Sequence, residues 1–493
     1  MVTSTTTIDQ NAVVVVMVPL PLQGHLNQLL HFSRLISAHN IPVHFVSTTV
    51  HGGKARLRLE GWNPNIISNI FFHEYYLQPF ESPPPNPNSN TMFPAHLYPL
   101  CETATHLRRP VASLLRKLAP TTRRLVVIHD SLMGSVVQDF VCFPNAETYT
   151  FHSVSAFSIA LYASEKVRVE IQKLMKPQTL TRDLVSFEGC FTSEFKKFIA
   201  TQHEYTKLSS GRIYNTCKVL EQPILDLLEI DAQNKKRCVP AHDVPNSLFD
   251  SQHQKDRSNK TLNSNKLLWA LGPFNPLDVK RSKLEQSSWL KWLDKQASNS
   301  VIFVSFGTTT LFSKEQINEI AIGLEESNQK FVWVVRDADD GRVSREIKLL
   351  VGYENRVKDQ GLVVRKWAPQ LEILSHRSIG GFMSHCGWNS CIESLSMGVP
   401  IAAWPIHSDQ PNNAVLVTEV LKAGLVVKEW CQREQVVAAA SVENVVRRLM
   451  GSKEGEDLRK RAAAMSCRIR NSVCNGGLSQ IELESFIAHI TRN

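Results

Sequence analysis

Several features of specialised protein classes are missing from this chain. Its 10 cysteines are spread singly from Cys101 to Cys474 without a C-x-x-C pair, which disfavours both a disulfide scaffold and a structural zinc site. No stretch reaches the ~18 apolar residues that a membrane-spanning helix needs. Asp9, rather than a basic lead, precedes the apolar run 12–18, so that run does not read as a secretory signal. We therefore expect a cytoplasmic protein with reduced thiols and no membrane insertion.

Two catalytic motifs are missing as well. HExxH and paired Cys-His spacings are absent, which predicts no bound metal. The G-x-G-x-x-G fingerprint of nicotinamide-dependent oxidoreductases does not follow the first apolar run, where the chain reads Pro19-Leu20-Pro21-Leu22-Gln23-Gly24 instead. The formal charge of +9, from 55 basic and 46 acidic residues, is scattered over short clusters. It indicates a solvated basic surface and predicts no nucleic-acid partner.

The chain does contain a repeated alternation of strand and helix patterns. Its 493 residues exceed what one hydrophobic core usually serves, so two domains are expected. The apolar run 12–18, a helical pattern opening at His25 and an extended run at 42–46 form a first βαβ unit. The alternation restarts at 301–306, after a polar stretch at 250–265. The sequence therefore predicts an α/β fold with two parallel-sheet halves.

The composition also predicts boundaries and local structure. We expect domains at 1–250 and 276–472, a linker at 251–275 and a terminal helix at 473–493. Expected strands of the second half lie at 301–306, 331–335, 362–365, 379–383, 400–403 and 424–427, and expected helices at 313–326, 441–450, 456–470 and 479–490. Ser313 with Gln316, and Ser479 with Glu482, stand in capping-box register. The Pro- and Asn-rich segment 80–99 predicts a long surface loop.

The most informative stretch runs from Trp367 to Gln410. It reads Trp367-Ala368-Pro369-Gln370, then His385-Cys386-Gly387-Trp388-Asn389-Ser390, then Glu393, and ends in Asp409-Gln410. An expected strand ends at Met383 and a helix starts near Trp388, so free backbone N–H groups and the positive end of the helix dipole point at one spot. Such a spot binds phosphate, and Gly387 lets the backbone approach it closely.

The side chains of this stretch suit the other parts of a nucleotide sugar. Trp367 offers an aromatic face to a flat base, and Glu393 offers a carboxylate to two ribose hydroxyls. His385 supplies a further donor to a diphosphate, or a positive charge if protonated. Further donors and acceptors are Asn389, Ser390, Asp409 and Gln410. Each alone has an ordinary structural explanation, but their order and spacing together predict a nucleotide-sugar site.

This stretch resembles the plant secondary-product glycosyltransferase signature, the donor-binding box of family 1 UDP-glycosyltransferases. The resemblance implies the GT-B fold, in which two Rossmann-like domains face each other across a cleft. Residues 1–250 would bind the acceptor, 276–472 would bind a UDP-sugar, and the helix at 473–493 would cross back to the N-terminal domain. It also implies an enzyme that needs no cofactor beyond its UDP-sugar co-substrate, and we expect a monomer.

The resemblance implies a role for each residue of the box. Trp367 would stack on uracil, the backbone of Ala368 would bond the base, and Gln370 with Glu393 would hold the ribose. The residues implied at the diphosphate are His385, Gly387, Asn389, Ser390 and the backbone of Trp388. Asp409 and Gln410 would bind the transferred sugar, and a final Gln favours UDP-glucose without excluding UDP-xylose. In the turn after 301–306, hydroxyl donors at Thr308 and Thr310 would help the leaving UDP carry its charge.

The N-terminal counterpart of the box is the strand-to-helix turn that ends in Gly24 and His25. A lone histidine at a helix start is more often a surface residue or a cap, but a donor box in the other half makes His25 a candidate base. A neutral imidazole with a pKa near ~6.5 can take a proton from an attacking hydroxyl. The resembling family orients such a histidine with an aspartate, whose counterpart here is Asp130. Gly24 is expected beside the donor, and His129 is expected to pack rather than react.

Together these observations predict inverting, metal-independent transfer of a sugar, first of all glucose, from a UDP-sugar to a hydroxyl of a small plant metabolite. Segments 19–28, 45–48 and 128–131 most resemble the zeatin O-glycosyltransferase group, so a zeatin-type cytokinin is the first expected acceptor. It would bind in a cleft lined by 80–99 and 148–157. A flavonoid or another phenol is the alternative acceptor. A catalytically silent UDP-sugar-binding protein is the alternative of another class, which the presence of His25 disfavours.

Overall fold

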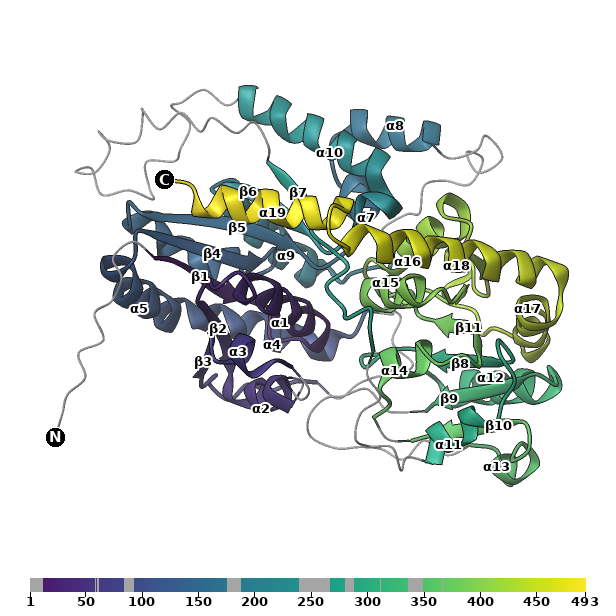
Figure 1. Ribbon diagram of the computed structural model, residues 1–493. Coiled ribbons are helices and arrows are strands. Elements are labelled where there is room, and N and C mark those ends of the chain that lie inside the picture. The colour runs from purple at the N-terminus through teal and green to yellow at the C-terminus, as the bar shows by residue number, and fades with distance from the viewer. Residues whose placement is uncertain are drawn as a thin grey trace.

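The computed structural model describes residues 12–57, 59, 62–83, 93–174, 188–238, 267–279, 288–310, 312–335, 349–365 and 367–493. They form two α/β halves that lie side by side, with the last helix of the chain returning to the first half (Figure 1). None of the helices in these ranges combines the length and the hydropathy that crossing a bilayer requires.

The first half is built on a parallel sheet of seven strands in the order β3-β2-β1-β4-β5-β6-β7. Its strands are β1 (Val13–Val18), β2 (Val43–Thr48), β3 (Ile70–Tyr75), β4 (Arg124–Asp130), β5 (Ala146–His152), β6 (Gly211–Tyr214) and β7 (Leu268–Ala270). The valine-rich β1 is buried along its whole length because helices cover both faces of the sheet.

The second half is built on a parallel sheet of six strands in the order β10-β9-β8-β11-β12-β13. Its strands are β8 (Val301–Ser305), β9 (Lys330–Val334), β10 (Gly361–Val364), β11 (Ile379–Ser384), β12 (Ile401–Ala403) and β13 (Gly424–Val426). The six strands expected here are confirmed, with ends that differ by at most one residue. The parallel α/β fold is confirmed in both halves.

Helices connect the strands and cover the sheets. In the first half they are α1 (Gln23–Ser37), α2 (Thr49–Leu57), α3 (Pro64–Ile67), α4 (Tyr98–Ala104), α5 (Arg108–Leu118), α6 (Gly134–Val137), α7 (Ala156–Leu161), α8 (Glu165–Leu174), α9 (Ser193–Thr206) and α10 (Lys218–Cys238). In the second half they are α11 (Ser288–Asp294), α12 (Lys314–Glu326), α13 (Tyr353–Arg356), α14 (Gln370–Leu374), α15 (Trp388–Met397), α16 (Gln410–Val415), α17 (Ala439–Gly451), α18 (Lys453–Val473) and α19 (Leu478–Thr491).

The two halves share a hydrophobic core and do not merely touch. One buried cluster joins α7 and α10 of the first half to α15, α16 and α18 of the second. Helix α19 then packs on the first sheet, where Leu483, Phe486 and Ile490 join the cluster that also contains β1 and α1. The relative position of the two sheets is therefore fixed by apolar contacts on one side of the molecule.

Local expectations differ from the structure at the start of α19 and in the segment 80–99. The capping box of Ser479 and Glu482 is wrong: Gly477 is the N-cap of α19 and makes no side-chain cap bond. Ser479 bonds the carbonyl of Gly272 instead, and Glu482 pairs with Lys218 at 2.8 Å. The expected loop at 80–99 turns helical at its end, because a 3-10 turn begins at Ala95 and runs into α4; residues 84–92 lie outside the described residues.

The expected linker at 251–275 falls largely outside the described residues, which resume at 267. Within the described part, β7 pairs with β6 and so adds the last strand to the first sheet. One of the two hydrogen bonds of the capping box predicted at Ser313 and Gln316 is present: the Ser313 hydroxyl accepts from the backbone N–H of Gln316 at 3.1 Å. The side chain of Gln316 bonds the backbone of Val437 rather than that of Ser313.

Candidate active site

The topology itself marks one place on each sheet. The strand order reverses between β1 and β4 in the first sheet and between β8 and β11 in the second. In open α/β sheets ligands bind beyond the carboxyl ends of the strands at such a switch point. His25 follows β1 and Asp130 ends β4, while Thr308 follows β8 and His385 follows β11. A single cavity of about 2530 Å³ connects the two switch points and is lined by residues of both halves.

On the first half, His25 and Asp130 form a pair. The Nδ1 atom of His25 lies 2.7 Å from Oδ2 of Asp130, whose side chain is fully buried, while 21% of the histidine side chain remains exposed. The hydroxyl of Ser153 lies 3.0 Å from the same nitrogen. Burial works to lower the pKa of His25, but the charge and the hydrogen bond of Asp130 outweigh it, and the pKa is raised. Within the described residues the second ring nitrogen, Nε2, has no hydrogen-bond partner, and the residue lines the cavity.

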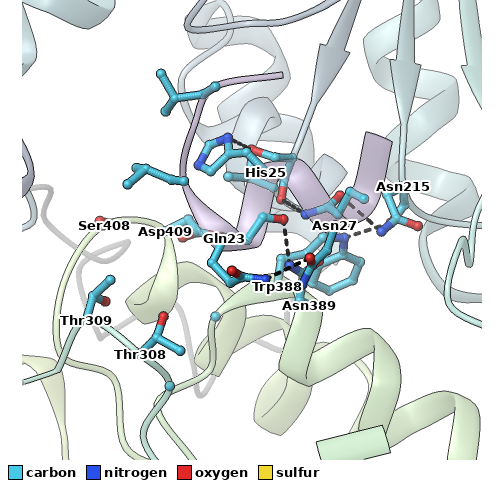
Figure 2. Close-up of a pocket in the computed structure, with 18 of the residues that line it drawn as sticks. Gln23, His25, Asn27, Asn215, Thr308, Thr309, Trp388, Asn389, Ser408 and Asp409 are labelled. Carbon is cyan, nitrogen blue, oxygen red and sulfur yellow. Dashed lines mark hydrogen bonds between the residues drawn. The ribbon is translucent and has the colours of Figure 1, made fainter. Parts of the chain in front are cut away.

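The start of α15 docks against the first half. The indole nitrogen of Trp388 donates to the backbone carbonyl of Asn215 at 2.8 Å, and the amide of Asn389 donates to the carbonyl of Gly24, also at 2.8 Å. Figure 2 shows both side chains at the start of α15, facing the segment of α1 that carries His25. The histidine and the donor box are thus held together by direct bonds across the cleft.

His385 sits between two glycines that have no room for a side chain. A Cβ atom added to Gly307 or Gly387 would lie 2.8 or 2.5 Å from Nε2 of His385. Gly307 also has a positive φ of 77°, which a residue with a side chain rarely adopts. Burial lowers the pKa of His385 to about 4, so the imidazole is neutral near neutral pH. It can therefore offer a hydrogen bond to an anion but not a full positive charge.

The chain between β11 and α15 is shaped to expose backbone N–H groups. Cys386 has a positive φ of 63°, and Gly387 is the N-cap of α15 without any side-chain cap. The first N–H groups of a helix lack partners inside the helix, and here no side chain occupies them at the N-cap. This helix start lines the cavity and provides the positive end that the sequence predicted for a phosphate.

The residues predicted for a base and a ribose lie together in the wall of the cavity. The amide of Gln370 donates to Glu393 Oε2 at 2.8 Å and to the hydroxyl of Ser390 at 2.9 Å. Trp367 is 59% exposed and Ala368 lies beside it, and both line the cavity. A large aromatic side chain left in contact with solvent at a cavity rim suits the stacking of a ligand ring.

Asp409 is held by Asn413, which is not among the site residues predicted from the sequence. The side chain of Asn413 donates to Oδ2 of Asp409 at 2.7 Å and to the carbonyl of Cys386 at 2.9 Å. Its oxygen accepts from the hydroxyls of Ser155 at 2.7 Å and Ser158 at 3.2 Å, on the first half. Burial raises the pKa of Asp409 to about 6, against the hydrogen bond of Asn413, which lowers it.

Gln410 is oriented by its own backbone loop. Its side-chain oxygen accepts from the N–H groups of Ile406 at 2.9 Å and His407 at 3.0 Å. Its amide nitrogen lies 3.4 Å from Nδ1 of His407, which leaves its second N–H for a ligand. Thr308 lines the cavity as predicted, and so does Thr309, which lies 3.4 Å from the ring of His407.

Thr310 is not among the residues that line the cavity, although the sequence predicted its hydroxyl as a donor to the leaving UDP. Its hydroxyl donates to the carbonyl of Phe306 at 2.6 Å, and the residue is buried behind the cavity wall. The direction of each threonine side chain depends on the backbone of the turn, including the positive φ of Gly307. Three identical residues in the sequence do not reveal these dihedral angles, so the sequence could not show that Thr310 points away from the cavity. The other box residues named from the sequence line the cavity, as does Gly24; Asp130 lies behind His25.

Three contributors were missed: Ser153, Thr309 and Asn413. A signal existed for two of them. Ser153 falls in the segment 148–157 that was expected to line the cleft, and Asn413 follows Asp409 by four residues, one helical turn, so the two side chains share a face. Among the residues that the structure describes, no group of three or more His, Cys, Asp or Glu side chains is placed to hold a metal ion.

The fold and the site together define a class of protein. Two Rossmann-like halves with a shared cleft, a histidine–aspartate pair on one side and a helix start with a base-and-ribose end on the other, constitute a GT-B glycosyltransferase. Family models match both halves: "Glycosyltransferase, N-terminal domain" over residues 11–241 and "UDP-glucoronosyl and UDP-glucosyl transferase" over residues 277–454.

The chain belongs to the UDP-glycosyltransferase family. It is 49% identical to the zeatin O-glucosyltransferase of Phaseolus lunatus, with 98% of each chain covered. It is 47% identical to the zeatin O-xylosyltransferase of Phaseolus vulgaris, covering 98% of this chain and 99% of that one. A solved structure of Phytolacca americana UGT2 complexed with UDP-2-fluoro-glucose and pterostilbene is 25% identical, with a TM-score of 0.71 over 98% of this chain and 100% of that one. The predicted family and its zeatin O-glycosyltransferase group are confirmed.

Proposed function

We propose that the protein transfers glucose from UDP-glucose to a hydroxyl of a zeatin-type cytokinin, with inversion at the anomeric carbon. The observation that carries this proposal is the His25–Asp130 pair, which faces the donor box inside one cavity. The acceptor is inferred from the two Phaseolus relatives, whose names specify zeatin. On this proposal residues 1–250 form the acceptor domain and 276–472 the donor domain.

His25 is the proposed base. With Nδ1 held by Asp130, Nε2 takes the proton of the acceptor hydroxyl as its oxygen attacks the anomeric carbon of the sugar. The buried carboxylate of Asp130 fixes the tautomer and stabilises the imidazolium that forms. The bond to UDP breaks as the new bond forms on the opposite face, so an α-linked donor gives a β-glycoside.

The leaving UDP is stabilised by the donor half. On this proposal the N–H groups at the start of α15, the neutral His385 and the hydroxyl of Thr308 face the diphosphate; all three residues or segments line the cavity. Such preorganised donors stabilise charge that develops in the transition state. Trp367 would stack on the uracil ring, and Gln370 with Glu393 would bind the ribose hydroxyls.

The transferred sugar is assigned to Asp409 and the amide nitrogen of Gln410. Because its pKa is about 6, Asp409 is ionised near neutral pH and accepts hydrogen bonds from two sugar hydroxyls. Glucose and xylose differ at C5, where glucose carries a hydroxymethyl group. The nearly equal identity to a glucosyltransferase and a xylosyltransferase makes UDP-xylose the second donor to test.

The test is a matrix of donors and acceptors. UDP-glucose, UDP-xylose and UDP-galactose are each incubated with trans-zeatin, cis-zeatin and a flavonoid panel, and products are identified by mass spectrometry and by the coupling constant of the anomeric proton. We expect a β-O-glucoside of a zeatin, formed fastest from UDP-glucose. An α-linked product would overturn the mechanism, and turnover of flavonoids alone would overturn the acceptor.

The matched control is His25→Ala in the same matrix. We expect kcat to fall by roughly 10²- to 10⁴-fold, the range of general-base catalysis, while UDP binding is kept. A variant that retained full turnover would remove His25 from the mechanism. A wild-type protein that bound UDP-glucose with no turnover of any acceptor would instead favour the silent binding protein.

A further inference from the structure

Part of the cavity, called the extension, is lined by apolar and polar residues of α9 and β6 in the first half. Helix α9 lines this extension with Phe195, Ile199 and His203, which are spaced four residues apart and so share one face of the helix. Arg212 of β6 lines the cavity as well. His203 and Arg212 are together called the polar end.

The polar end and the proposed base line the same cavity on the first half. The hydroxyl of Ser153 is 3.0 Å from Nδ1 of His25, and its chain neighbour His152 also lines the extension. Asp130 ends β4, β5 pairs with β4, and β6 with Arg212 pairs with β5. Two strand spacings, roughly 10 Å, therefore separate the strand that orients the base from the strand that carries the guanidinium.

The charges around the polar end favour a ligand that accepts hydrogen bonds. A guanidinium has only hydrogen-bond donors, so Arg212 can donate but not accept. Burial and then the charge of Arg212 lower the pKa of His203, against the charge of Asp130, and an imidazole offers at least one N–H in either protonation state. The acids of this region already have partners: Asp130 is engaged by His25, Asp231 accepts from the hydroxyl of Ser164 at 2.8 Å, and Glu229 accepts from the backbone N–H of Leu267 at 3.0 Å.

The imidazole ring of His152 is held in place beside the polar end by stacking. Its ring stacks on Tyr214, with centroids 4.9 Å apart and an interplanar angle of 23°. Burial and the charge of Arg212 hold the pKa of His152 well below its usual value. Of the two residues of the polar end, Arg212 is the one with a guanidinium, and it lines the cavity.

We propose that His203 and Arg212 form an acceptor subsite that binds the ring nitrogens of a nitrogen heterocycle, while Phe195 and Ile199 cover the face of its ring. This inference rests on the proposed function and adds to it which residues select the acceptor. Ring nitrogens with in-plane lone pairs can accept from both donors. An all-carbon ring would leave these donors desolvated and unpaired, and such a mismatch is what lets a hydrogen-bonding site reject analogues. A heterocycle held here can direct a side-chain hydroxyl back toward His25.

The experiment compares Arg212→Met and His203→Phe with Lys196→Met. Lys196 is an exposed cation on α9 that also lines the cavity, so its variant removes a positive charge from the same wall without touching the polar end. We expect KM for trans-zeatin to rise by about 10-fold or more in the first two variants, the loss of one to two hydrogen bonds to the ligand, with KM for UDP-glucose within about twofold. Lys196→Met should match the wild type. Unchanged KM for trans-zeatin in both folded variants would overturn the subsite.

Arg212→Lys guards against a folding defect. It keeps the charge in β6 but loses the planar fork, so an intermediate KM is expected, and a melting temperature equal to the wild type establishes that the fold is intact. A KM equal to the wild type in this variant together with Arg212→Met would count against a role for the guanidinium.

Adenine alone separates failure of the subsite from failure of the proposed function. If no zeatin is turned over, the proposed acceptor is wrong, but adenine can still be tested as an inhibitor of whichever acceptor reacts. Competitive inhibition that is lost in Arg212→Met supports the subsite. Absence of inhibition, inhibition that survives in the variant, or stronger inhibition by benzoate than by adenine would overturn it.

Discussion

The side-chain amide of Asn389 donates a 2.8 Å hydrogen bond to the backbone carbonyl of Gly24, the residue that precedes His25. The two residues are 365 positions apart and come from opposite halves of the molecule (Figure 2). Asn389 opens α15, whose start is the proposed diphosphate site, and Gly24 lies in the first turn of α1. The bond therefore couples the position of the base to the position of the donor.

Removing this bond should slow the reaction with a modest change in stability. A net hydrogen bond contributes about 1 kcal/mol, so Asn389→Ala should lower kcat/KM about 5- to 10-fold and the melting temperature by only a few degrees. Asn389→Asp keeps the size but turns an oxygen toward the carbonyl of Gly24, and should be at least as slow. Steady-state kinetics and thermal unfolding measure both. Wild-type rates in the Asp variant would contradict the coupling.

The pH dependence of kcat should report the His25–Asp130 pair. The base acts when neutral, so turnover is present above the pKa of His25 and is lost as the pH falls through it. Asp130 raises that pKa, and Asp130→Asn should therefore move the acidic limb of the profile to lower pH. The plateau rate should fall as well, by roughly 10²-fold or more, because the imidazolium loses its counter-charge.

Asp139→Asn is the matched control for that profile. Asp139 pairs with Arg108 on the surface at 2.8 Å, so its substitution removes a carboxylate of the same half without touching His25. The acidic limb of the kcat profile of Asp139→Asn should coincide with that of the wild type between pH 5 and pH 9. A limb that stays in place in Asp130→Asn, or moves to higher pH, would exclude the assigned role of Asp130.

Much of the scaffold was predictable because its signals are local. Continuous apolar runs such as 13–18 and 301–305 are typical of strands buried on both faces, and their alternation with helices implies parallel sheets. The carboxyl ends of β1 and β11 then fix where His25 and His385 must lie. The spacing of the box from Trp367 to Gln410 located the donor half of the site for the same reason.

The cross-cleft contacts were not predictable, since they join residues far apart in the chain. Nothing near Asn413 in sequence indicates that it meets Ser155, 258 positions away. Local patterns also fail where a distant partner competes: Glu482 fits a capping box but pairs with Lys218 instead. The turn after β8 shows the same limit on a smaller scale, because backbone dihedrals decide which threonine faces the cavity.

Asn413 should control how Asp409 titrates. Burial raises the pKa of Asp409, and the hydrogen bond from Asn413 lowers it again, to about 6. Asn413→Ala removes that hydrogen bond, so the pKa of Asp409 should rise above about 6. On our proposal UDP-glucose binds the ionised carboxylate of Asp409. As the pH falls, KM for UDP-glucose should therefore begin to increase at a higher pH in the variant than in the wild type. The variant should also lose stability, by about 1–3 kcal/mol for each buried group left unpaired.

Asn412→Ala provides the comparison for this variant. Asn412 is the preceding residue and is 1% exposed, and within the described residues neither amide atom has a hydrogen-bond partner. Its replacement removes a buried amide of the same size without breaking a bond, so the pH profile of KM should not move. A shift of equal size in both variants would show that Asn413 acts through packing and not through its bond to Asp409.

Trp367 should affect ligand binding without affecting the fold. It is 59% exposed, so Trp367→Ala removes little buried surface and should leave the melting temperature within a few degrees of the wild type. Stacking of a base on an aromatic ring contributes about 1–3 kcal/mol, so the Kd for UDP should rise by roughly 10- to 100-fold, as measured by isothermal titration calorimetry. Trp367→Phe keeps a smaller aromatic ring, so its Kd for UDP should lie between those of the wild type and Trp367→Ala. An unchanged Kd in Trp367→Ala, with lowered thermal stability, would assign the indole to packing and place the uracil elsewhere in the cavity.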